Sequence, residues 1–529
     1  MARTTAWKSG RTTPPVRMDA DVIIIGTGAG GGTLARALSG SGLKLLLLER
    51  GNFLRRTKSN WEPDAVFRRH LYHTREPWLD RNGAPFHPVT GYHVGGNTKL
   101  FGAAVLRRRE CDFGALHHRD GETVSWPIRY PDLASFYDRA ESWYFAHGQR
   151  GEDPTEPPAS GPFPYPPVSH EPAIEAVFRR LQDCGLRPFH LPLAIHLDEM
   201  HSATSPCIRC DTCDGFPCLV LAKGDAENCA IRPALADPDV VLKTGIRITR
   251  LRSSDDGRRI VAVEGEGERG PESFSARVVV LAAGAVNSAA LLLASGNLAH
   301  PRGLANSSDQ VGRNYMCHLN SVMLALSPWH SRSIVFQKTI GVNDYYHESG
   351  DPQFPYPLGH VQLLGKVTGA VLKAERPALP SFLARWFGRH SVDWWLTTED
   401  LARADNRVTL TAAGQIRLSY TPNNVEAHAR LLAAWRAVLR RIGFRFIFSQ
   451  RIGIEGVAHQ VGTARFGTDP SQSVLDPYCR AHEVDNLFVV DGSFMPSIAA
   501  VNPSLTIMAQ ALRVADHLKA RLAAGDWHG

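Results

Sequence analysis

The 529-residue sequence lacks the features of several large protein classes. It contains no apolar run of about eighteen residues, the length that a membrane-spanning helix needs. The first residues, MARTTAWKSGRTTPPVRMDA, are positively charged but hold no apolar segment typical of a secretory signal, which favours a cytoplasmic protein. Internal repeats and low-complexity segments are also missing. With 43% hydrophobic and 21% charged residues, the composition is that of an ordinary globular protein.

Long basic runs are absent too, although the formal net charge is +7. The basic residues fall in short groups such as 107–109 and 440–441, without the interleaved aromatics of a nucleic-acid interface. We expect these groups on a solvated surface, with some arginines committed to a phosphate-bearing cofactor. The expected partner is therefore a small molecule and not a nucleic acid.

Residues 21–49 have the pattern of a strand, a glycine turn, a helix and a second strand. Gly26, Gly28 and Gly31 give the spacing G-x-G-x-x-G, which permits a tight turn, close approach of a pyrophosphate and close packing of the helix on the strand. Glu49 ends the second strand, where a carboxylate can accept hydrogen bonds from a ribose 2′-hydroxyl. The segment predicts a dinucleotide site and argues against NADP, but it does not separate NAD from FAD.

Further segments, in this order, resemble the glucose-methanol-choline (GMC) oxidoreductase family. They are 91–98 (GYHVGGNT), 284–296 (GAVNSAALLLASG), 459–467 (HQVGTARFG), 489–493 (VVDGS) and 502–503 (NP). The resemblance spans nearly the whole chain. It implies an FAD-dependent enzyme that oxidises an alcohol carbon to a carbonyl, with proton abstraction and hydride transfer to flavin N5.

The resemblance also implies a two-domain α/β fold. A Rossmann-like FAD-binding domain is expected from residues 18–112, 200–299 and 455–529. A substrate-binding domain, built on a mainly antiparallel sheet, is expected from residues 113–199 and 300–454.

The FAD site implied by the resemblance draws on distant segments. The double glycine 95–96 would bring backbone against the flat flavin ring, where a Cβ would collide, and Asn97 and Thr98 would offer polar groups near flavin N5. Some relatives attach the flavin through a histidine after this double glycine, but Leu100 stands at that position here, so we expect non-covalent FAD. The predicted cofactor-binding residues are Gly26, Gly28, Gly31, Glu49, Gly95, Gly96, Asn97, Thr98, Ala283, Asp491, Gly492 and Pro503.

Two residues are predicted to carry the chemistry. His459 stands at the family's catalytic histidine position, and a largely neutral imidazole suits removal of a hydroxyl proton. Asn502 stands at the partner position, where its amide would hydrogen-bond the substrate hydroxyl. An alternative for Asn502 is a helix N-cap followed by Pro503 at the first helical position. In either case the helix expected over 503–518 would stabilise negative charge on the reduced flavin.

Five cysteines fall within a short segment, and four of them have the spacing C-x2-C-x2-C-x4-C. These four are Cys207, Cys210, Cys213 and Cys218. The spacing resembles an iron–sulfur or zinc site, but it departs from the bacterial ferredoxin pattern, which has three residues before the last cysteine. An iron–sulfur cluster, a zinc site, disulfides and plain thiols all remain open.

Sequence likeness around 191–195 and 222–226 to members that act on sugars, glycosides and aminoglycosides favours a carbohydrate hydroxyl as the substrate. Oxidation of a non-sugar alcohol and a non-redox FAD-containing lyase are the alternatives. Trp394, Trp395 and Tyr345, with Tyr346 and Tyr356, are candidates to stack on a sugar. Gln362 and His360 are weaker pocket candidates. Oxygen or a protein partner as electron acceptor, and the oligomeric state, cannot be predicted from these residues.

Overall fold

The computed structural model describes residues 17–327, 334–456 and 458–526. Within these ranges the α-helices are α1 (Ala29–Leu38), α2 (Pro131–Trp143), α3 (Pro172–Asp183), α4 (Arg232–Ala234), α5 (Ala285–Ala294), α6 (Gly369–Glu375), α7 (Ser381–His390), α8 (Val425–Arg441) and α9 (Ser504–Ala523). No helix in the described part of the chain is both long and apolar enough to cross a membrane.

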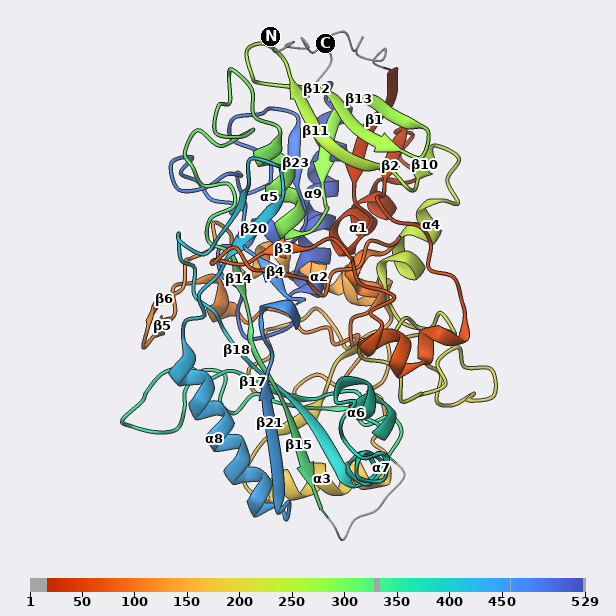
Figure 1. The fold of residues 1–529 in the computed structure, drawn as a ribbon, viewed down its shortest axis with the longest axis vertical. Helices are drawn as coiled ribbons and strands as arrows, with labels where there is room; N and C mark the ends of the chain where they lie inside the picture. The colour runs from red at the N-terminus through yellow and green to blue at the C-terminus, as the bar shows by residue number, and fades with distance from the viewer. Residues whose placement is uncertain (1–16, 328–333, 457, 527–529) are drawn as a thin grey trace, which may run out of the picture.

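A mixed sheet forms the upper part of the molecule in Figure 1, with α1, α5 and α9 beside it. Its strands are β1 (Arg17–Ile25), β2 (Leu45–Leu48), β10 (Val240–Lys243), β11 (Arg247–Ser253), β12 (Ile260–Gly267), β13 (Gly270–Leu281) and β23 (Leu487–Val489). Strands β10, β2, β1, β13 and β23 pair in parallel, and β12 and β11 extend the sheet antiparallel from β13. The apolar runs 22–25 and 45–48 are buried because they lie in the middle of this sheet.

An antiparallel sheet forms the lower part of the molecule (Figure 1). In spatial order its strands are β21 (Phe446–Arg451), β15 (Leu319–Leu326), β18 (Ser391–Thr398), β17 (His360–Leu363), β16 (Ile340–Val342) and β8 (Pro188–His190). One face packs in a second hydrophobic core with residues of α3 and α8, where Trp394 meets Trp435 at a ring distance of 4.8 Å. The strands alternate, so their other side chains point away from this core.

Short sheets lie outside the two large ones. They pair β14 (Met316–Cys317) with β22 (Gln460–Val461), β19 (Arg407–Leu410) with β20 (Ile416–Ser419), β20 with β3 (Trp78–Leu79), β3 with β4 (Pro85–Phe86), β5 (His117–His118) with β6 (Gly121–Glu122), and β7 (Ala146–His147) with β9 (Leu193–Ala194). In the first pair Cys317 lies opposite Gln460. This register brings the residues next to them, His318 and His459, together.

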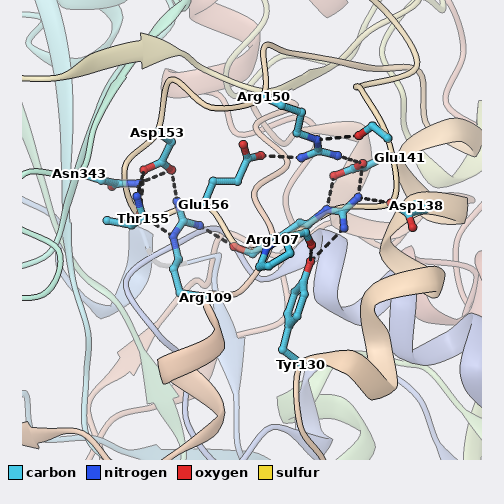
Figure 2. Close-up of polar contacts among 12 residues, drawn as sticks. Arg107, Arg109, Tyr130, Asp138, Glu141, Arg150, Asp153, Thr155, Glu156 and Asn343 are labelled. Atoms are coloured by element: carbon cyan, nitrogen blue, oxygen red, sulfur yellow. Dashed lines mark hydrogen bonds and ion pairs between the residues drawn. The ribbon is translucent and has the colours of Figure 1, made fainter.

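The basic group at 107–109 is buried, contrary to the surface position expected from the sequence. Arg107 lies 2.7 Å (Nε–Oε1) and 2.6 Å (Nη2–Oε2) from Glu141, and Arg109 pairs with Asp153. Figure 2 shows these pairs in one network, with Arg150 on the other side of Glu141. Buried guanidinium groups need such partners because an unpaired buried charge is costly. The group therefore belongs to the frame of the protein.

The predicted α/β fold class is confirmed, with some local differences. Strands β10 and β11 are separated by a turn in which Gly245 adopts a left-handed φ of 68°. The helix expected over 503–518 is α9, which begins at Ser504 and ends at Ala523. The domain boundaries proposed from the sequence stay a prediction.

Candidate active site

A cavity of about 1650 Å³ lies between the two large sheets. One side, which we call the nucleotide wall, is formed by the β1–α1 turn, the loop 96–98 and the turns at 283–284 and 491–492. The opposite side, which we call the sheet wall, is formed by residues of the antiparallel sheet, namely Val322, Leu324, Gln362, Trp395, Phe448 and Gln450. His459 and Asn502 line the same cavity.

The glycines of the β1–α1 turn are required for different reasons. A Cβ on Gly26 would lie 2.4 Å from the Ala282 carbonyl oxygen, and one on Gly31 would lie 2.1 Å from the Gly26 carbonyl oxygen. These two glycines allow close packing. A Cβ on Gly28 would meet only Gly96 Cα, at 3.9 Å, so the space beside Gly28 is open toward the cavity. Helix α1 begins directly after it without a side-chain cap, so its first N–H groups can bind an anion.

Glu49 fixes the shape of this turn. Its Oε2 accepts hydrogen bonds from the backbone N–H of Thr27 at 3.0 Å and from the Thr27 hydroxyl at 2.7 Å, and its Oε1 accepts from Gly51 N–H at 2.9 Å. Burial raises the pKa of this carboxyl, and these hydrogen bonds oppose that rise. The sequence predicted a contact with a ribose but not this structural role. Since Glu49 also lines the cavity, both roles are compatible.

The double glycine lies against the β1–α1 turn. Gly95 and Gly96 have φ angles of 94° and 56°, and a Cβ on Gly96 would lie 2.9 Å from Gly28 Cα. The Thr98 hydroxyl donates to the Gly95 carbonyl and accepts from Ala226 N–H at 2.9 Å. It therefore holds the loop in place, where the sequence predicted a polar group offered to flavin. The side-chain oxygen Oδ1 of Asn97 likewise accepts from Gly91 N–H, at 2.9 Å.

Asp491 connects two turns of the nucleotide wall. Its Oδ2 accepts from Gly284 N–H at 3.0 Å and from the Ser288 hydroxyl, while its Oδ1 accepts from Ser493 N–H at 2.9 Å. Burial raises the pKa of its carboxyl. Ala283 and Gly492, the other predicted residues here, line the cavity beside it.

His459 is paired with a second histidine that the sequence did not single out. His318 Nδ1 lies 2.9 Å from His459 Nδ1, and His318 Nε2 lies 2.8 Å from the Ala499 carbonyl oxygen. A carbonyl oxygen only accepts, so His318 carries its proton on Nε2 and its Nδ1 is an acceptor. His459 Nδ1–H must then donate to it. The remaining nitrogen of a neutral His459, Nε2, has a free lone pair.

Burial and the nearby Lys338 ammonium lower the pKa of His459 to about 4. The pKa of His318 is also lowered, by burial and by His459. Both rings are therefore neutral near neutral pH, which the tautomer argument requires. No local sequence signal marks His318, because its partner lies far away along the chain.

Asn502 follows a strained turn. Ala499 has a φ of 61°, in the left-handed region that non-glycine residues rarely adopt. Its N–H donates to Glu399 Oε1 at 2.6 Å, and its carbonyl accepts from His318. Pro503, not Asn502, occupies the N-cap position of α9, so the capping alternative for Asn502 is wrong. Its side chain makes no hydrogen bond within the described ranges and lines the cavity.

The four spaced cysteines do not form a metal centre. All nine cysteines are free thiols. Among the described residues, no three His, Cys, Asp or Glu side chains are gathered closely enough to hold a metal ion. Burial raises the pKa of Cys207 to about 11 and that of Cys213 to about 12. The predicted iron–sulfur or zinc site is thus not formed by Cys207, Cys210, Cys213 and Cys218 in this structure.

The pocket candidates of the antiparallel sheet divide between its two faces. Trp395 and Gln362 are register partners on the sheet wall, whereas Trp394 is buried on the opposite face. Tyr346 is also buried and donates to Asp112 at 2.8 Å, so it belongs to the protein frame. Alternation along β18 explains why neighbouring tryptophans have different environments.

A dinucleotide cradle that opens onto a cavity with a neutral histidine defines the class: a nucleotide-dependent oxidoreductase. The sequence pattern of the family described as GMC oxidoreductase matches residues 169–320 and 392–511. The 6'''-hydroxyparomomycin C oxidase of Streptomyces lividus is 31% identical to this chain, over 95% of this chain and 92% of its own length. The paromamine 6'-oxidase of Streptomyces fradiae is 31% identical, over 96% and 91%.

A solved structure of pyridoxine 4-oxidase from Mesorbium loti shares the fold, with a TM-score of 0.66, 20% identity and coverage of 94% of this chain and 98% of that one. The chain belongs to the GMC oxidoreductase family. It is an FAD-dependent oxidoreductase that acts on CH–OH groups.

Proposed function

We propose that this enzyme oxidises a hydroxyl group of a sugar, glycoside or aminoglycoside-type polyol, with His459 as the base. The observation that carries the proposal is the His459–His318–Ala499 chain of hydrogen bonds. It leaves the lone pair of His459 Nε2 free in a cavity that can hold a substrate beside a dinucleotide.

In the proposed reaction His459 Nε2 takes the hydroxyl proton, and the carbon–hydrogen bond of the same carbinol breaks as a hydride leaves. A carbonyl group forms, and His459 becomes an imidazolium whose Nδ1–H still donates to His318. FAD, when bound, supplies the acceptor for the hydride. The proton and the electron pair are thus both accounted for.

Asn502 is proposed to orient the reacting group. Its amide can donate to the substrate oxygen without competing for the proton, and the structure leaves that amide without another partner in the described ranges. The uncapped N-terminus of α9 lies directly after it and favours negative charge in the cavity. We propose that Pro503 and this first turn face the flavin.

The residues of the nucleotide wall suit non-covalent FAD. Gly28 leaves room for the pyrophosphate, Glu49 retains acceptor capacity for a ribose, and Gly96 contributes backbone without a Cβ atom to the cavity lining. Leu100 lines the cavity where some relatives are expected to carry the attaching histidine, and a leucine side chain cannot form that bond.

The substrate class follows from the sheet wall and from the relatives. Trp395 offers an aromatic face beside the polar Gln362, a combination that suits a ring bearing hydroxyl groups. The names of two relatives state oxidation of aminoglycosides, and another is a fructose dehydrogenase large subunit of Gluconobacter japonicus.

The test is anaerobic titration of the flavin-loaded protein while its visible absorbance is followed. The panel contains paromamine, fructose, pyridoxine, 2-methyl-1,2-propanediol and a long-chain alcohol, which are the substrates stated or implied by the relatives' names. We expect the carbohydrates to bleach the flavin fastest. His459→Ala should slow bleaching by about 100- to 10,000-fold with normal flavin content.

If the non-sugar alcohols bleach the flavin faster, the proposed carbohydrate substrate is wrong, but the proposed oxidation of an alcohol still holds. Absence of bleaching by every alcohol, in protein with a normal flavin content, would rule out the proposed reaction. Admission of air after bleaching then separates an oxidase from a dehydrogenase.

A further inference from the structure

Gln362 lies on the sheet wall with one end of its side-chain amide toward the cavity. Its Oε1 is placed 3.2 Å from Nε2 of His360, a histidine that is 1% exposed. The other end of the amide makes no hydrogen bond within the described ranges, and Gln362 lines the cavity. Which group the substrate meets, a carbonyl or an NH₂, depends on which end of the amide His360 holds.

The buried network of Figure 2 fixes the orientation of the Asn343 side-chain amide, which contacts His360. The Asp153 carboxylate pairs with the Arg109 guanidinium, and its Oδ2 lies 2.8 Å from Asn343 Nδ2. A carboxylate oxygen that pairs with a guanidinium accepts hydrogen bonds from its neighbours. The nitrogen end of the Asn343 amide therefore points to Asp153, and its carbonyl points the other way.

That carbonyl sets the proton position on His360. Asn343 Oδ1 lies 2.7 Å from His360 Nδ1, and because a carbonyl only accepts, the proton is on Nδ1. Burial, and next the charge of Arg109, lower the pKa of His360 to about 4, so the ring is neutral and carries one N–H. Its Nε2 has a lone pair and needs a donor.

We propose that Gln362 determines substrate specificity: its amide nitrogen donates to His360 Nε2, and its carbonyl oxygen faces the cavity and accepts a hydrogen bond from a hydroxyl or ammonium group of the substrate. The two ends of an amide have nearly the same shape, so the half-turn that exchanges them meets no steric obstacle. With Oε1 at His360, two acceptors would face each other.

This inference rests on the proposed function and narrows it. The oxidised molecule must carry a second polar hydrogen besides that of the reacting hydroxyl. Trp395 is the register partner of Gln362 on the neighbouring strand, so an apolar face lies next to the acceptor. A sugar ring or an amino sugar offers both an apolar face and donors, whereas a simple alcohol has only the reacting hydroxyl.

The test asks whether a substrate hydroxyl other than the reacting one must donate a hydrogen bond. Paromamine, or any alcohol of the panel that bleaches the flavin faster, is compared with analogues in which one other hydroxyl is replaced by hydrogen or by fluorine. Fluorine retains weak acceptor character but cannot donate. At the position that meets Gln362, both analogues should lose about 10- to 100-fold in the ratio of flavin reduction rate to dissociation constant.

Gln362→Met keeps the length of the side chain and removes the amide. In this variant, the ratio of flavin reduction rate to dissociation constant should be the same for the parent alcohol and for its analogues at that position. Gln450→Met is the matched control on the same wall, because the Gln450 carbonyl is already occupied by Arg376 Nη2 at 2.7 Å. Gln450→Met should leave the 10- to 100-fold difference between the parent alcohol and its analogues unchanged.

The proposal is overturned if the fluorinated analogue reacts like the parent at the position sensitive to Gln362→Met, since the amide NH₂ would then face the cavity. It is also overturned if no substrate position besides the reacting hydroxyl requires a hydrogen-bond donor. The same holds if the Gln362→Met variant still requires that donor. Because each of these results needs flavin bleaching by the parent alcohol, they are distinct from a failure of the proposed reaction.

Discussion

The nucleotide wall of the cavity is formed mainly by backbone, whereas the sheet wall is formed by side chains. At Gly26, Gly31 and Gly96 a Cβ would collide with backbone atoms, so the shape of the nucleotide wall depends on residues with no side chain. On the sheet wall, Trp395 and Gln362 are aligned by strand register, and the buried His360 holds one end of the Gln362 amide. Substitutions should therefore act through shape on the first wall and through hydrogen bonding or stacking on the second.

The largest effect is expected from Gly30→Ala on the nucleotide wall. Its Cβ would lie 2.0 Å from the Val490 carbonyl oxygen, a backbone atom that cannot move away without disturbing β23 and the turn after it. Overpacking of this kind costs about 1–3 kcal/mol or more. We expect a clear fall in the melting temperature together with loss of FAD, measured by thermal unfolding and by flavin content.

Gly28→Ala is the matched control, because its φ of −70° suits alanine and its Cβ meets no atom closer than 3.9 Å. The variant should fold with nearly unchanged stability in the absence of FAD, yet bind FAD poorly because the methyl group fills the space beside the turn. A normal flavin content in Gly28→Ala would place the pyrophosphate elsewhere.

A second large effect should follow removal of His318. In His318→Ala nothing fixes the tautomer of His459, and a wrong tautomer has no lone pair toward the substrate. We expect flavin reduction to slow by about 100- to 10,000-fold, the range that a positioned general base contributes, while flavin content stays normal. His318→Gln can still accept from His459 and donate to Ala499, so it should recover most of the rate. Equal losses in both variants would indicate a merely structural role.

The two tryptophans of β18 should separate binding from stability. Trp395→Leu is expected to weaken binding of a sugar substrate by about 10-fold, with little change in melting temperature, because Trp395 faces the cavity. Trp394→Leu should instead destabilise the fold by about 2–4 kcal/mol, since Trp394 is fully buried against Trp435. Titration of flavin bleaching and chemical denaturation measure the two effects. The reverse pattern would contradict the assignment of the two faces.

The smallest effect concerns pH. With its pKa lowered to about 4, His459 is the neutral base above that pH, and flavin reduction should slow only as pH falls through it. Lys338→Met removes a nearby positive charge and leaves the Asp214 carboxylate without this ion pair, so the pKa of His459 should rise. The acid limb of the rate profile should then move to higher pH. A shift to lower pH would show that another group titrates.

Much of the nucleotide wall could be predicted from the sequence, because a glycine turn between a strand and a helix is a local pattern. Likeness to a known family also singled out His459 and Asn502, and both line the cavity. It did not predict the second roles of Glu49 and Thr98, whose partners lie on other segments. The spacing of the four cysteines left a metal site, disulfides and plain thiols open, and the described structure gathers no metal site there, since spacing along a chain does not fix distances between sulfur atoms.

The sequence by itself determined the βαβ unit with its glycine turn and the family to which this protein belongs, because each is recognised from short motifs whose own residues are close together in the chain. Only the tertiary structure decided which nitrogen of His459 is free and which end of the Gln362 amide faces the cavity. Both follow from chains of hydrogen bonds between segments far apart in the sequence. Each chain begins at an oxygen that accepts, the Ala499 carbonyl or the Asp153 carboxylate, and this oxygen determines which atom of each following side chain donates.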